Sequence, residues 1–292
     1  MKIFLLIDGG LGNQLFEYAF GRALSIRTGG DLVMDAWEAR SGRSRPLQLH
    51  HFNIQARFTT KFENAICRLV DSQRLRLPSR LLRRIAPGML PTVVRRKKHG
   101  FDPAVFDHKG SVFLDGWWQS ELYFRDHREL ILADLTFRQP PDAVNQECLD
   151  QIRATNAVCV HVRRGDYVTD PFILKNFGIC GPEYYQAAFG LIGGQVASPT
   201  YFVFSDDPEW TRQNLPVPEP RRFISHNCQV SDWEDLRLMS ACRHFVIANS
   251  TFSWRGAWLC THSAKRVIAP KRWFAASEIA GRDIIPADWT TL

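Results

Sequence analysis

The sequence lacks the features that define several protein classes. None of its apolar runs approaches the roughly 20 residues of a membrane-spanning helix, and its first residues, MKIFLLIDGG, have neither the long apolar core nor the small-residue cleavage site of a secretory signal. The seven cysteines form no Cys-x-x-Cys pair, and their odd number and apolar neighbours favour reduced, mostly buried thiols. These absences predict a folded protein of the cytoplasm.

Common metal and nucleotide motifs are also missing. The sequence contains no Asp-x-Asp tripeptide and no cluster of His, Cys and carboxylates with the spacing of metal ligands, so we expect no bound metal. Its first glycine-rich loop, GGLGNQ, lacks the third glycine of the dinucleotide fingerprint and the Lys-Ser/Thr pair of a P-loop. Neither NAD nor a nucleoside triphosphatase is supported, and no cofactor is expected.

Acidic residues are scarce in one segment. The net charge is +7, and residues 64–98 contain ten Lys or Arg residues with Asp71 as the single acid, which leaves the rest of the chain slightly acidic. Residues 68–98 mix Leu and Ile with Arg, which fits either an amphipathic helix on anionic lipid head groups or a solvated helix. A basic nucleic-acid-binding protein is a weaker alternative, because no nucleic-acid-binding motif is present and nucleic acid is not an expected partner.

The order of apolar runs predicts an α/β protein with two Rossmann-like domains facing a cleft. Residues 3–7 form an apolar run, the glycine loop follows, a helical pattern begins near Leu15, and a second strand covers residues 31–35. After an irregular region up to residue 112, strands alternate cleanly with helices from residue 157 to 268. We place the domains at residues 1–145 and 146–292.

The stretch VCVHVRRGDY carries the strongest chemical signal. It delivers His161, Arg163, Arg164 and Asp166 from an apolar strand into a turn, where open α/β sheets bind ligands. Two adjacent guanidiniums suit a diphosphate, because each offers a fixed fork of donors and a permanent charge. The alternatives are a surface ion pair and, from the tripeptide Arg-Gly-Asp, a chance match to an adhesion motif.

Three further segments fit the same site. Ser205, Asp206 and Asp207 stand at a helix start, where one acid caps the helix. The second acid either stays free for a sugar, base or ribose hydroxyl or also serves only the helix start. The run from Asn249 through Ser250, Thr251 and Phe252 to Ser253 makes a neutral phosphate cradle or a plain helix cap. Asp235 faces the cleft and reads guanine, or is a solvated helical residue.

Six motifs together resemble the inverting α-1,2-fucosyltransferases that use GDP-L-fucose, of the bacterial and animal galactoside type. In that family's order the chain contains GGLGNQLFEYAFGRAL, LDGWWQSELYF, HVRRGDY, VFSDDPEW, DLRLMSACRHFVIANSTFSWRGAWL and VIAPKRWF. The resemblance implies a fold of the GT-B type with the nucleotide mainly on the C-terminal domain and the acceptor on the N-terminal one. The chain departs from the family at Arg255, where a second Trp is more frequent, and at Trp117, where Tyr is.

The resemblance also implies roles for residues. Arg163 and Arg164 would hold the pyrophosphate, with His161 and Asp166 organising the same turn. Residues 250–253 would line the phosphate and fucose, and Asp235 would read guanine. The residues expected to approach the donor from the N-terminal domain are Gly10, Gly12 and Asn13.

The implied reaction transfers L-fucose to the 2-hydroxyl of a terminal β-galactoside with inversion and without metal. GDP-L-fucose is then a co-substrate, and the acceptor is a galactose-terminated glycan, free or lipid-linked. Stabilising the departing GDP lowers the barrier most directly, so a strong base is optional. Asp166 is the nominated base, and its alternative role is to orient an arginine. The alternative is a transferase that uses GDP-fucose but forms another linkage.

Overall fold

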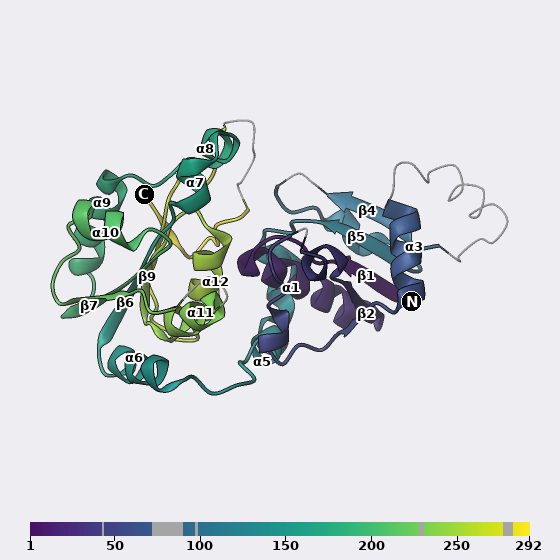
Figure 1. Ribbon diagram of the computed structural model, residues 1–292, viewed down its shortest axis with the longest axis horizontal. Coiled ribbons are helices and arrows are strands. Elements are labelled where there is room, and N and C mark those ends of the chain that lie inside the picture. Colours follow the sequence, from purple (N-terminus) through teal and green to yellow (C-terminus); the bar gives the residue numbers. More distant parts are fainter. Residues whose placement is uncertain (43, 72–89, 97–98, 228–230, 277–282) are drawn as a thin grey trace. The chain divides into compact units, whose positions relative to one another are not determined.

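The computed structural model describes residues 1–292 apart from 43, 72–89, 97–98, 228–230 and 277–282. The chain divides into two compact units (Figure 1). Unit 1 consists of Met1–Arg138 and Arg282–Ile284, and unit 2 of Gln139–Gly281 and Ile285–Leu292. The change of unit after Arg138 lies just before Pro140, whereas the boundary placed after residue 145 falls inside helix α6 (Ala143–Arg153).

The described strands of unit 1 form a parallel sheet in the order β3-β2-β1-β5-β4. These strands are β1 (Lys2–Leu6), β2 (Asp31–Asp35), β3 (Arg57–Phe58), β4 (Thr92–Arg96) and β5 (Val112–Gly116). The α-helices described are α1 (Leu11–Thr28), α2 (Trp37–Arg40), α3 (Lys61–Asp71) and α5 (Arg128–Asp134). Short 3₁₀ turns are η1 (Leu49–His51), η3 (Pro103–Asp107), η4 (Glu121–Tyr123) and η5 (Arg125–His127).

Alternate residues of the unit 1 strands pack on opposite faces of the sheet. Phe4, with neighbours from β2 and β5, packs against Cys67 of α3. Helix α1 approaches the other face closely at Gly21, where an added Cβ would lie 2.7 Å from a methyl of Leu5 and 2.9 Å from one of Leu32. Glycine is therefore needed there for α1 to pack at this distance.

The described strands of unit 2 form a second parallel sheet in the order β11-β10-β9-β6-β7-β8. They are β6 (Asn156–Val162), β7 (Pro199–Ser205), β8 (Arg221–Ile224), β9 (His244–Val246), β10 (Val267–Ala269) and β11 (Thr290–Thr291). Besides α6, the helices are α7 (Gly165–Thr169), α8 (Pro171–Phe177), α9 (Pro182–Gly193), α10 (Pro208–Asn214), α11 (Asp232–Ala241) and α12 (Thr251–Leu259).

The alternation predicted for the second half of the chain is confirmed, whereas two details of the first half are wrong. Helix α1 begins at Leu11 rather than near Leu15, so most of the predicted glycine loop is helical. The region read as irregular contains β3, α3 and β4. The periodic signal of α1 is weakened at its start by Gly10 at the N-cap and Gly12 in the first turn, and β3 and β4 are short.

Two composition-based expectations concern cysteine and the membrane. None of the six described cysteines forms a disulfide, and five of the six are buried. Among the described residues, no helix has both the length and the apolar character that a membrane crossing requires. The membrane contact predicted for residues 68–98 lies largely outside the described residues, which in that range are 68–71 and 90–96.

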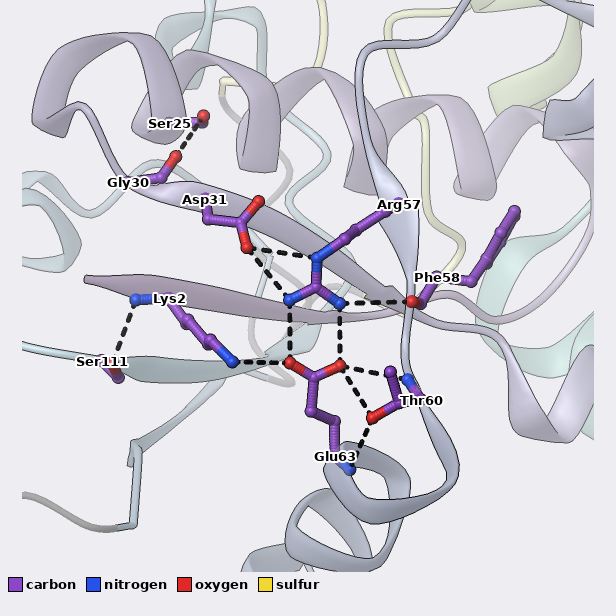
Figure 2. Close-up of polar contacts among 9 residues, drawn as sticks. All are labelled: Lys2, Ser25, Gly30, Asp31, Arg57, Phe58, Thr60, Glu63 and Ser111. Atoms are coloured by element: carbon purple, nitrogen blue, oxygen red, sulfur yellow. Dashed lines mark hydrogen bonds and ion pairs between the residues drawn. The ribbon is translucent and has the colours of Figure 1, made fainter.

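A network around Glu63 joins the start of α3 to the sheet of unit 1 (Figure 2). Glu63 and Thr60 form a capping box, in which the Thr60 hydroxyl accepts from the Glu63 N–H at 3.2 Å and Glu63 accepts from the Thr60 N–H at 3.0 Å. Both Glu63 oxygens also accept from Arg57, at 2.7 and 2.8 Å, and one accepts from Lys2 at 2.7 Å. Because Arg57 binds the charged form, the pKa of Glu63 is strongly lowered.

We expect Glu63→Gln to lower the free energy of unfolding by about 1–3 kcal/mol at pH 7, because a buried acceptor of several charged donors is lost. A lowered folded-state pKa means that the stabilisation is present above the unfolded-state pKa and is lost as the pH falls, so the two proteins should converge in acid. Urea unfolding of the full chain at pH 7, pH 4 and pH 2 measures this difference, which should still be largely present at pH 4 and should shrink as the pH falls further towards the strongly lowered folded-state pKa.

Asp31→Asn is the matched control. Asp31 pairs with the same Arg57, but its side chain is 51% exposed, so its removal should change the free energy of unfolding by less than about 1 kcal/mol. Equal losses in the two variants would contradict the assignment.

Candidate functional site

The candidate site of unit 2 begins at the carboxyl ends of β6 and β7. These strands are parallel neighbours, and Val162 at the end of β6 is paired with Ser205 at the end of β7. The two arginines that follow β6 therefore lie beside the two aspartates that follow β7. The loops after β6 and β7, which are far apart in sequence, therefore meet at the carboxyl edge of the sheet, where α/β proteins bind ligands.

Arg163 is held by carboxylates from both loops. One terminal nitrogen donates to Asp166 at 2.6 Å, and the other lies 3.0 Å from Asp206. Its guanidinium carbon is 5.3 Å from the centroid of the Tyr167 ring. Arg163 thus cross-links its own turn to the loop after β7.

Arg164 has a different environment. Its Nε donates to Asp207 at 3.1 Å, and its guanidinium carbon lies 3.6 Å from the centroid of the Trp210 ring, within the range of a cation–π contact. The side chain is only 14% exposed. Its backbone N–H donates to Asp206 at 2.8 Å, so the main chain and the side chain are both fixed.

The loop after β7 uses both of its acids within the protein. Asp207 caps α10 by accepting from the N–H of Trp210 at 3.3 Å, as the sequence predicted. The expectation that the second acid stays free is wrong, because Asp206 binds both arginines and packs so closely on Gly165 that a Cβ there would lie 2.6 Å from its oxygen. Ser205 is occupied as well, since its hydroxyl accepts from the Asp207 N–H at 3.0 Å.

His161 is a buried neutral residue beneath the turn. Its residue surface is 5% exposed, and burial together with the Arg163 charge lowers the pKa of His161 to about 3. Its carbonyl accepts from the Tyr185 hydroxyl at 3.0 Å, and its ring lies 5.8 Å from that of Phe252. A neutral imidazole in this position organises the loop and adds no charge for a phosphate.

The loop after β9 places some predicted residues in the interior. The Asn249 amide nitrogen donates to the carbonyls of Phe177 at 2.8 Å and Trp273 at 3.1 Å. Ser253 is fully buried, and its hydroxyl donates to the carbonyls of Ala248 and Ser250. The side chains of Asn249 and Ser253 therefore hold the loop together.

The start of α12 keeps the character of an anion site. Ser250 occupies the N-cap position with extended backbone and makes no side-chain capping bond, so the helix-cap alternative is not realised at this residue. Thr251 and Phe252, which follow it, are partly exposed. A helix start without a side-chain cap offers N–H donors and a positive dipole end to a phosphate.

Asp235 belongs to a buried polar network near the end of β8. It accepts from the Asn227 amide at 2.7 Å, and Asn227 exchanges hydrogen bonds of 3.0 and 3.1 Å with the fully buried Asn145. His226 lies 2.9 Å from the same Asn145 oxygen. Burial raises the pKa of Asp235 to about 6, although the Asn227 hydrogen bond opposes this shift. Asp235 itself is partly exposed, so its carboxylate is accessible both to solvent and to a ligand.

The glycine loop of unit 1 is shaped by a close contact. Gly9 has φ +76°, and a Cβ on it would lie 2.8 Å from the Asn13 amide nitrogen, so two constraints require glycine. Gly10 is exposed at the N-cap of α1, Gly12 is buried in its first turn, and Asn13 accepts from Gln119 at 3.1 Å. Because the units are described separately, the convergence of this loop with unit 2 stays a prediction.

Two kinds of residue in this site were not expected from the sequence. Trp210 stands three positions after its capping aspartate in the motif VFSDDPEW, and an aromatic residue so close to a predicted ligand loop was a usable signal. Asn145 and Asn227 gave no signal, because they are 82 positions apart and meet only in the fold.

Arg255, where the chain departs from the family pattern, is fully buried. Its guanidinium carbon lies 5.0 Å from the centroid of the Trp254 ring and 5.3 Å from that of the Trp258 ring.

A family model and several sequence relatives match the chain. The model described as Glycosyl transferase family 11 covers residues 98–292. Alpha-1,2-colitosyltransferase from Escherichia coli is 33% identical over 304 residues, covering 98% of this chain and 97% of that protein. The O-antigen biosynthesis glycosyltransferase WbnK of Escherichia coli is 33% identical, with 93% and 94% covered. Galactoside alpha-(1,2)-fucosyltransferase 1 from Leontocebus fuscicollis is 28% identical over 156 residues, which cover 50% of this chain and 42% of that protein.

The fold matches solved structures at low sequence identity. A mutant of Arabidopsis thaliana FUT1 in complex with GDP aligns with a TM-score of 0.53 and 11% identity, covering 98% of this chain and 74% of that one. POFUT1 in complex with GDP aligns with a TM-score of 0.50 and 12% identity, covering 92% and 97%. At these identities the likeness concerns the fold alone.

We expect Asp235→Asn to stabilise the protein, by about 1–3 kcal/mol at pH 7.5. The folded-state pKa lies above the ordinary carboxyl value near 3.9, so the charged form destabilises the fold at neutral pH and the penalty vanishes in acid. Urea unfolding should show a gain at pH 7.5 that disappears near pH 4. Glu209→Gln, whose side chain is 77% exposed, should be neutral at both, and a loss of stability from Asp235→Asn would refute the assignment.

Proposed function

Since the chain belongs to glycosyl transferase family 11, we propose that it transfers L-fucose from GDP-L-fucose to the 2-hydroxyl of a terminal β-galactoside, forming an α-1,2 linkage with inversion. The family membership and the GT-B fold that the sequence motifs predicted are both confirmed. The donor and the acceptor are proposals. The observation that carries them is the arginine pair after β6, fixed by the aspartates after β7 and accompanied by the start of α12.

This geometry suits the stabilisation of a leaving diphosphate. As the bond from the sugar to GDP breaks, negative charge grows on the diphosphate, and a guanidinium held in place beforehand needs no reorganisation to meet it. Arg164 is the better placed of the two, because Arg163 already binds two carboxylates. The N–H groups at the start of α12 supply further donors without adding a charge.

Asp166 has two proposed roles, and its surroundings favour one. A general base must be free to take the proton of the attacking hydroxyl. Asp166 instead accepts a 2.6 Å hydrogen bond from Arg163, which supports the role of orienting that arginine. Because a departing diphosphate is a good leaving group once neutralised, the proposal does not require a strong base.

The nucleotide base is assigned to the network around Asp235. A carboxylate accepts two N–H bonds from the Watson–Crick edge of guanine, and Asn227 already orients one of its oxygens. Keeping a carboxylate with a raised pKa in a partly buried position is unfavourable for stability and is understandable if a ligand uses it.

Colitose is the second candidate for the transferred sugar. It is favoured by the 33% identity to an α-1,2-colitosyltransferase over 98% of this chain. The α-1,2 linkage is common to both candidates. The acceptor is proposed as a galactose-terminated glycan, free or lipid-linked, handled in the cytoplasm at or near the inner face of a membrane.

We also propose that catalysis needs no divalent metal. In the described part of the chain no group of three or more His, Cys, Asp or Glu side chains is arranged to hold one. A cation would also compete for the three carboxylates that the two arginines occupy. Arginine charge and helix N–H donors take the role that a metal plays in other diphosphate sites.

The test is transfer in excess EDTA. Purified protein should bind GDP by calorimetry, and with GDP-L-fucose and a β-galactoside it should yield a product whose linkage analysis shows α-1,2 fucose. Preference for GDP-colitose would select the second candidate. Absence of guanine nucleotide binding by folded protein would refute both, and activity restored only by Mn²⁺ would refute the metal-free mechanism.

Arg164→Ala should lower kcat by about 10²–10³-fold while the fold is retained, because the charge opposite the leaving group is removed. Arg164→Lys should recover part of the rate, since it restores the charge without the planar fork. Steady-state kinetics with circular dichroism as a folding check measures both.

Arg212→Ala is the matched control for Arg164→Ala. Arg212 lies on α10 in the same unit and pairs with the exposed Glu209. The Arg212→Ala variant should leave kcat unchanged. Near-normal turnover of Arg164→Ala would remove the basis of the proposed mechanism.

A further inference from the structure

Trp210 connects the interior of unit 2 to the arginine turn. One side of Trp210 packs against the hydrophobic cluster that includes Val160, Val203 and Leu215. The face of its ring lies 3.6 Å from the guanidinium carbon of Arg164. The ring is therefore a fixed platform, anchored in the core, on which the arginine side chain rests.

Asp207 ties the platform and the arginine together. One of its oxygens accepts from the backbone N–H of Trp210 at 3.3 Å, and the other accepts from Nε of Arg164 at 3.1 Å. A single carboxylate thus fixes the start of α10, which carries the ring, and the guanidinium that lies on the ring.

The terminal nitrogens of the two arginines differ in what they contact. Those of Arg163 face Asp166 and Asp206. Across the described residues, the hydrogen bonds of the Arg164 guanidinium to protein involve Nε alone. With one face covered and Nε occupied, the two terminal nitrogens of Arg164 are the part of the fork left for an anion.

We propose that Trp210 and Asp207 are positioning residues that set the plane of Arg164 so that its terminal nitrogens meet the diphosphate of the donor. This inference rests on the proposed function. A long arginine side chain that is ordered on folding does not lose its rotamer freedom on binding, so the affinity for the diphosphate increases. Partial burial over an aromatic face keeps the charge without satisfying its donors.

A purely structural Trp210 would give a different result from a positioning one. Loss of core packing would weaken nucleotide binding whatever residue stands at position 164. Loss of positioning would weaken nucleotide binding only when residue 164 is an arginine, whose planar guanidinium must be oriented. A double-mutant cycle between Trp210 and Arg164 separates these cases.

The experiment measures the Kd for GDP by calorimetry, and kcat and KM for GDP-L-fucose, in the full chain. Trp210→Leu keeps an apolar side chain without a π face, and should raise the Kd about tenfold. Trp210→Phe should restore most of the affinity. In the Arg164→Lys background, which retains charge but has no planar fork, Trp210→Leu should change the Kd by less than about threefold.

Two further variants complete the design. Asp207→Asn preserves an oxygen to cap α10 but weakens the contact to Nε, and should raise the Kd for GDP severalfold with little change in unfolding temperature. Arg212→Ala removes the arginine of α10, whose guanidinium lies over the Phe223 ring, and should leave the Kd unchanged.

The inference is overturned if Trp210→Leu weakens GDP binding by the same factor in both backgrounds, or leaves it unchanged in the wild-type background. These outcomes are distinct from failure of the proposed function. In that case the wild-type protein itself, folded and pure, would bind neither GDP nor GDP-L-fucose.

Discussion

The parallel pairing of β6 with β7 is the constraint on which the candidate site depends. Its register pairs Val162 with Ser205, so the residues that follow β6 lie beside the residues that follow β7. A slip of one residue would turn every side chain of the strand to the other face and separate the arginines from the aspartates. The apolar residues of β6 and β7, buried in the core of unit 2, fix this register and thereby the ion pairs.

The charges of this cluster are closely balanced. Two guanidiniums face three carboxylates, from Asp166, Asp206 and Asp207. Such pairing makes it possible to keep two adjacent cations partly buried without a ligand, since each has a nearby counter-charge. A diphosphate that enters competes with these acids, and the start of α12 then contributes donors that need no counter-charge.

Polar networks of opposite character occur in the two units. Glu63 in unit 1 accepts from two cations and its own helix start, so its charge is well solvated by the protein and stabilises the fold. Asp235 in unit 2 is partly exposed, accepts from the Asn227 amide, and carries a pKa that its partial burial raises. The first network holds a helix on a sheet, whereas the raised pKa in the second means that the charged carboxylate destabilises the fold.

Sequence by itself determined the family, the alternation of strands and helices in unit 2, and the loops that carry the site, because these depend on local runs and on motifs such as HVRRGDY. It could also predict that one of the two aspartates before α10 caps this helix, since capping is a local interaction, and the structure identifies Asp207. Only the tertiary structure decided which partner each charged group has. Asp206 is bound rather than free, Arg164 rests on Trp210, and Asn145 meets Asn227. These contacts join residues brought together by strand pairing and helix packing, and no local pattern encodes them.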